Sequence, residues 1–220
     1  MTLVLIIAEL ALLYFLSVRV IQVIYSLLYY LFHSRPVGMS IVSLIFFPGT
    51  VVHELSHLFT AEILGVRTGH LTLVPESLDS TDVKTGSVAI ASTDPFRRTL
   101  IGIAPLLVGV MALATLSYVY NVKFVNNRTI TIVYYYLIFS ISNSMFSSKE
   151  DMKGVWPVFL VLGLFVGAAY WVGFRTELTG QMLEIADQIV DMMFRSLTLV
   201  LALNGIILLL FNLLIKTIRA

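Results

Sequence analysis

Long apolar runs separated by polar stretches are the main pattern of this sequence. Six runs are long enough, or nearly so, to cross a bilayer, which takes roughly 20 apolar residues in a helix. They cover residues 2–31, 39–64, 99–120, 129–146, 155–174 and 197–215. The first run exceeds the length of one upright helix, so we expect a span over residues 2–17 and then a tilted or amphipathic extension past Arg19.

Two of the connections between these runs have patterns of their own. Within the polar stretch 66–98, residues 70–74 and 87–91 alternate between apolar and polar positions, as strands do. Residues 175–196 instead place apolar side chains on one helical face and acidic ones on the other, which predicts an amphipathic helix lying on the membrane surface. The predicted fold is an all-α polytopic membrane protein with about six transmembrane helices. A small membrane-associated β-hairpin lies between the second and third.

Composition supports this class. Apolar residues make up 58% of the 220 residues and charged residues 12%, whereas soluble domains are about 45–50% apolar and about 25% charged. A soluble globule and a disordered chain are both excluded, and we expect one membrane-embedded domain over residues 1–220 with the lipid bilayer as its surroundings. The net charge of +1 gives no basic excess for binding nucleic acid.

The distribution of basic residues gives an orientation. Six alternating spans place both termini on one side, together with residues 66–98 and 148–153. Eight Lys and Arg residues fall on that side and five on the other. The positive-inside rule then predicts cytoplasmic termini. We expect a multi-pass protein of a prokaryotic cell membrane; its oligomeric state is open.

The second span carries the strongest chemical signal. The chain has no cysteine, so a metal would need His, Asp or Glu ligands. His53, Glu54 and His57 form the pattern H-E-x-x-H, in which two histidines four residues apart share one helical face. Ionisable residues inside a membrane span are costly unless they are paired or bind a metal. The pattern therefore indicates a Zn²⁺ site, with Glu54 next to the metal as a general base.

A catalytic zinc needs a third protein ligand, and the residues leave several candidates. The fourth span crosses in the same direction as the second, so the residues after it arrive at a similar depth and on the same side. This favours Glu150 and Asp151 over the remaining candidates. Those are Glu9, Glu62 and His70.

The residues from His53 to Val66 resemble the signature H-E-x-x-H-x-x-x-A-x-x-x-G of the site-2 protease family, the intramembrane zinc metalloproteases. Its second motif, N-x-x-P-x-x-x-x-D-G, is similar to Asn143–Met152, which keeps the Asn and the Asp but has Phe146 for Pro and Met152 for Gly. The resemblance covers about residues 40–155, the catalytic core. It implies that Asp151 is the third zinc ligand and that Asn143 helps to hold the substrate backbone or the oxyanion.

The resemblance implies hydrolysis of peptide bonds within or near transmembrane segments of other membrane proteins. We further expect one of the strand-like segments, 70–74 or 87–91, to receive the unwound substrate along its edge. Three alternatives remain. One is a catalytically inactive homologue that acts as a binding or scaffold protein. Another is a zinc membrane protease with a soluble-facing chamber, whose E-x-x-x-D helix has no match in the spacing of Glu184 and Asp187. The third is a transporter.

Overall fold

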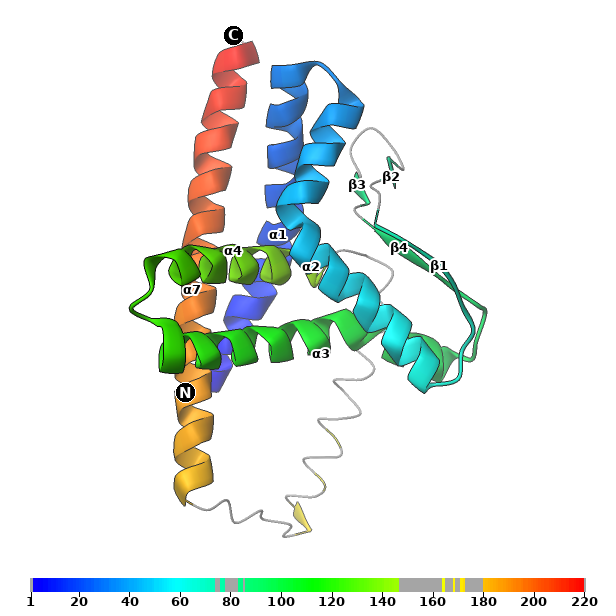
Figure 1. Cartoon of the computed structure of the whole chain (residues 1–220), viewed down its shortest axis with the longest axis vertical. Coiled ribbons are helices and arrows are strands. Elements are labelled where there is room, and N and C mark those ends of the chain that lie inside the picture. The colour runs from blue at the N-terminus through cyan, green and yellow to red at the C-terminus, as the bar shows by residue number, and fades with distance from the viewer. Residues whose placement is uncertain are drawn as a thin grey trace.

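The computed structural model describes residues 2–73, 76–77, 83–84, 86–146, 164, 168, 171–172 and 180–219. Helices dominate this part of the chain (Figure 1). They are α1 (Thr2–Phe32), α2 (Arg35–Ile63), α3 (Pro95–Val119), α4 (Arg128–Ser144) and α7 (Gly180–Arg219). One turn of π-helix, Tyr120–Phe124, extends α3.

Four of these helices are long and apolar enough to cross a membrane. The candidate spans are Leu5–Phe32, Arg35–Ile63, Pro95–Phe124 and Glu184–Thr217. The expectation of a multi-pass membrane protein is therefore supported. The predicted fourth span is the 17-residue helix α4, and the fifth, 155–174, lies almost entirely outside the described residues. The number of six spans stays a prediction.

The C-terminal region differs from the sequence-based expectation. Residues 175–196 were expected to form a separate surface helix before the last span, but Gly180–Arg219 is one continuous helix of 40 residues. No glycine or proline interrupts residues 181–204, so nothing in the sequence ends the helix where its character changes from amphipathic to apolar. The separation into two elements was wrong.

Helices α1 and α7 run side by side in the same direction. Thr198 of α7 donates a hydrogen bond of 2.5 Å to Glu9 of α1. Further along both helices, Arg19 and Leu208 line the same cavity. The two termini consequently lie at opposite ends of this pair (Figure 1). Six alternating spans predict termini on the same side of the membrane; among the described helices α1 and α7 run parallel, and α3 and α4 cross this pair instead of running along it (Figure 1).

The predicted hairpin between α2 and α3 is confirmed. Strands β1 (Thr68–Thr72) and β4 (Ser87–Ile90) pair antiparallel, with Leu71 opposite Val88. Two shorter strands, β2 (Glu76–Ser77) and β3 (Val83–Lys84), pair with each other further out. The period-two alternation thus located both main strands to within two residues.

Helix α4 docks on α2 where Pro48 interrupts the hydrogen bonding of α2. Proline has no N–H, so the carbonyl of Leu44 loses its helical donor, and the hydroxyl of Tyr136 donates to it at 3.3 Å. The N–H of Gly49 donates to Oγ of Ser140 at 2.9 Å. A Cβ on residue 49 would overlap the backbone carbonyl of Ser140. Pro48 and Gly49 therefore form a helix–helix contact, and α2 stays continuous through them.

A buried hydroxyl cluster ties three helices together near the middle of α4. Ser117 of α3, Tyr134 of α4 and Ser196 of α7 lie within 3.2 Å of one another through their side-chain oxygens. All three residues are buried, so each hydroxyl needs a protein partner. The cluster fixes α7 against the helices that carry the candidate site.

Candidate metal centre

The three residues of the H-E-x-x-H pattern lie in the second half of α2 and are buried there. His53 is 4% exposed, Glu54 5% and His57 7%. Helix α2 is continuous through them, so His53 and His57 occupy one face, one turn apart. The predicted placement of the two histidines on one helical face is confirmed. Buried ionisable groups are costly unless something compensates them.

The end of α2 explains why the signature has alanine at residue 61 and glycine at residue 65. Gly65 has a φ of +67°, and its N–H donates to the carbonyl of Glu62, while the N–H of Val66 donates to the carbonyl of Ala61. This pair of bonds is a Schellman motif, which requires a left-handed residue where glycine has no steric cost. Ala61 and Val66 then pack against Ile101 of α3, so the helix that carries the histidines ends in a fixed place.

The imidazole rings of His53 and His57 approach each other through their Nε2 atoms. Nε2 of His57 lies 3.2 Å from Nε2 of His53, with the rings edge to face. Two nitrogens bound to one tetrahedral zinc at about 2.05 Å would be about 3.3 Å apart. The observed separation therefore fits two ligands of a single ion, and it equally fits a hydrogen bond between the rings.

The hydrogen bond of the other His57 nitrogen decides which of its atoms can bind a metal. Nδ1 lies 2.8 Å from the carbonyl oxygen of Ile101 in α3. A carbonyl oxygen only accepts, so Nδ1 carries a proton, and in the neutral imidazole Nε2 then keeps its lone pair. Metal-binding histidines commonly have this second interaction, which sets the tautomer and the ring orientation. The donor set at His53 and His57 thus fits a divalent cation that accepts imidazole ligands.

Strand β4 begins directly beside Glu54. The buried Gly86, one residue before β4, approaches Glu54 and Thr50 so closely that a Cβ there would lie 3.0 Å from Oε1 of Glu54 and 2.9 Å from the Thr50 methyl group. Among the described residues, β4 pairs with β1 alone. The structure thus brings the start of one predicted substrate strand, 87–91, to the carboxylate of the pattern.

Asn143 lies in α4 at 1% exposure, and its amide is engaged with α7. Its Nδ2 donates to the carbonyl of Phe139 at 2.9 Å and to Oδ1 of Asn204 at 3.2 Å. Asn204 donates back to Oδ1 of Asn143 at 2.8 Å. These bonds point to α7 and to α4 itself, so a role in holding substrate would require Asn143 to exchange them.

The candidate third ligands divide into two groups. Asp151 and Glu150 lie outside the described residues. Of the remaining candidates, Glu62 and His70 are exposed on α2 and β1, and Glu9 accepts the hydrogen bond from Thr198. Within the described ranges, no three His, Asp or Glu side chains are grouped closely enough to hold a metal. The third ligand stays a prediction.

Sequence reasoning missed two residues that position the site. Ile101 contributes through its backbone carbonyl, for which side-chain patterns give no signal. Asn204 is fully buried in the middle of an apolar span and pairs with Asn143. A polar residue at that depth is itself a signal for an interhelical hydrogen bond, although its partner 61 residues away is not visible in the sequence.

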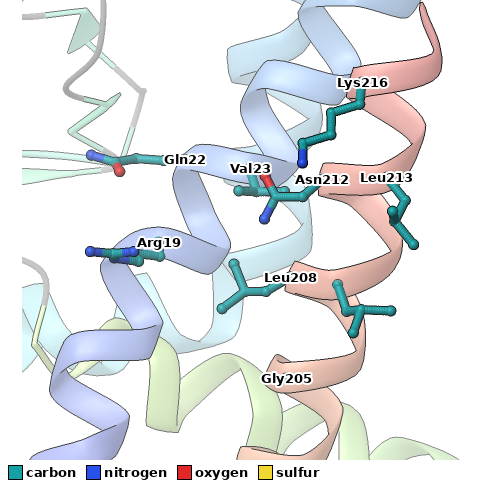
Figure 2. Close-up of a pocket in the computed structure, with 9 residues that line it drawn as sticks. Arg19, Gln22, Val23, Gly205, Leu208, Asn212, Leu213 and Lys216 are labelled. Atoms are coloured by element: carbon teal, nitrogen blue, oxygen red, sulfur yellow. The ribbon is translucent and has the colours of Figure 1, made fainter.

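A cavity of about 780 Å³ lies elsewhere, between α1 and α7 (Figure 2). Arg19, Gln22, Asn212 and Lys216 supply its polar lining, with leucines between them. In Figure 2, Arg19 and Gln22 extend to one side, whereas Asn212 and Lys216 face each other on α7. The two cations therefore do not converge on one point, and the cavity is not part of the histidine site.

No protein-family model matches the sequence, and no curated protein or solved structure is similar to it. The assignment of a function therefore rests on the residues and the geometry described above.

Proposed function

We propose that the protein is an intramembrane zinc metalloprotease of the site-2 protease type. It would hydrolyse peptide bonds within or near transmembrane segments of other membrane proteins. One observation carries the proposal. The buried His53 and His57 present their Nε2 atoms 3.2 Å apart, and the Ile101 carbonyl holds His57 in the tautomer whose Nε2 carries the lone pair that a metal would use.

Each residue of the proposed site has a separate role in the hydrolysis. His53 and His57 would hold the zinc, with Asp151 as the third ligand. A zinc ion in such a site polarises a carbonyl and lowers the pKa of bound water to about 7. Glu54 would accept a proton from the attacking water and deliver it to the leaving amine. Asn143 would assist the substrate backbone or the oxyanion after exchanging its bonds to Asn204.

The position of β4 supports a substrate in an extended conformation. A peptide bond in a helix is shielded by hydrogen bonding, so a transmembrane substrate has to unwind before it is cut. Pairing with a strand edge replaces the hydrogen bonds lost on unwinding. Because Gly86 lies against Glu54, a segment added along β4 would run beside the carboxylate.

The second candidate is a catalytically inactive homologue that binds membrane proteins. Two observations favour it: the histidine distance also fits a hydrogen bond between the rings, and the amide of Asn143 is engaged with Asn204. An inactive homologue would keep its binding function without metal, whereas a protease would lose its cleavage activity.

Cleavage in a defined membrane separates the two candidates. The full chain is reconstituted into vesicles together with a set of single-span fusion proteins that differ in their transmembrane segments, and products are identified by mass spectrometry. We expect cuts within or near the segments, loss of cleavage with 1,10-phenanthroline and recovery on adding Zn²⁺. Cleavage that persists at full chelation would contradict a metalloprotease. Zinc-loaded protein that cuts none of the segments would favour the inactive homologue.

A further inference from the structure

The Ile101 carbonyl can accept the hydrogen bond from His57 because a proline stands where its helical donor would be. In an α-helix the carbonyl of residue 101 accepts the N–H of residue 105. Residue 105 is Pro105, which is fully buried inside α3 and has no N–H. The Ile101 carbonyl is consequently released from the helix at the point where His57 of α2 reaches it at 2.8 Å.

The same arrangement occurs at the other internal proline of the described helices. Pro48 releases the carbonyl of Leu44, and the hydroxyl of Tyr136 occupies it at 3.3 Å. In both cases a side chain from a neighbouring helix replaces the missing N–H. The bond to Ile101 is shorter than the bond to Leu44, and its donor is a buried imidazole of the H-E-x-x-H pattern.

We infer that Pro105 is a positioning residue for the metal ligand His57. By leaving the Ile101 carbonyl without a helical donor, Pro105 makes it a strong acceptor for the Nδ1 proton of His57. This holds the ring orientation and directs the Nε2 lone pair toward His53. The inference rests on the proposed zinc site and adds to it a residue that touches neither the metal nor the substrate.

The test is Pro105→Ala, which gives residue 105 an N–H that competes for the Ile101 carbonyl. We expect zinc affinity, measured on the full chain in detergent by competition with a chelating dye, to fall about tenfold or more, the usual effect of losing such a supporting bond. Leu106→Ala is the matched control, because it shortens a neighbouring side chain of α3 without adding a donor, and it should change zinc affinity less than threefold.

A second variant separates the missing N–H from the packing of the proline ring. Lactic acid at position 105 forms an ester that has the side chain of alanine and no N–H. Zinc affinity should return to within about threefold of the wild type. Equal weakening by the ester and by Pro105→Ala would overturn the inference and assign the effect to ring packing. Equal zinc binding by wild type and Pro105→Ala would also overturn it, whereas a wild type that binds no zinc would instead refute the proposed function.

The tautomer of His57 can be measured directly, which tests the inference without a substitution at position 105. In metal-free wild-type protein with ¹⁵N-labelled histidine, we expect the His57 resonances, assigned with His57→Gln, to show protonated Nδ1 and unprotonated Nε2. Protonated Nε2 on His57 would overturn the inference even if Pro105→Ala failed to fold.

Discussion

Glu54→Gln is expected to reduce peptide cleavage by about 10²–10⁴-fold, the usual contribution of a general base. Glutamine has nearly the shape of glutamate but cannot accept the proton of the attacking water. Because Glu54 is not among the proposed zinc ligands, the variant should keep its zinc. Its rate is measured with the single-span fusion proteins in vesicles, and its metal content by mass spectrometry.

Glu62→Gln is the matched control on the same helix. Glu62 is exposed and lies two turns beyond Glu54, so its neutralisation should leave the cleavage rate within about twofold of the wild type. A Glu54→Gln variant that retained more than a tenth of the wild-type rate would exclude Glu54 as the base.

Gly49→Ala is expected to lower the free energy of unfolding by about 2–3 kcal/mol, because overpacked interiors cost roughly this much. The added Cβ would lie 2.5 Å from Oγ of Ser144 and 2.6 Å from the carbonyl carbon of Ser140. The serine hydroxyl can rotate away, but the backbone of α4 cannot move without disturbing the contact with α2. Unfolding is followed in mild detergent with increasing denaturant.

Gly38→Ala tests the same substitution in the same helix without the overlap. The nearest atoms to a Cβ at residue 38 belong to Tyr25 and Tyr29 at 3.5–3.6 Å, which is ordinary contact. Since alanine is the better helix former by about 1 kcal/mol, Gly38→Ala should be neutral or stabilising. Equal stability of the two variants would show that the close approach of α2 and α4 is not as described.

Local patterns in the sequence predicted the elements that carry the site. The apolar run at 39–64 corresponds to α2, and the period-two alternation after it corresponds to β1 and β4, because both depend on neighbouring residues in the chain. The H-E-x-x-H spacing likewise placed His53 and His57 on one face, since the helical repeat alone determines this.

What the sequence did not predict depends on residues far apart in the chain. The hydrogen bond from His57 to Ile101 spans 44 residues, and the pair of Asn143 and Asn204 spans 61. Neither partner is selected by local periodicity. The continuous α7 was missed for a different reason. The pattern of polar and apolar residues changes near residue 197, from amphipathic to apolar. The helix propensity of the residues does not change there, so the helix continues.

The proposal of a metalloprotease depends first on a metal held by His53 and His57. Its most direct test is the zinc content of the purified full chain, by mass spectrometry, in wild type, His57→Ala and His70→Ala. We predict about one zinc per chain in the wild type, none in His57→Ala, and an unchanged content in His70→Ala, since His70 is exposed on β1. A folded wild-type protein without metal, or a His57→Ala variant that keeps its zinc, would contradict the account.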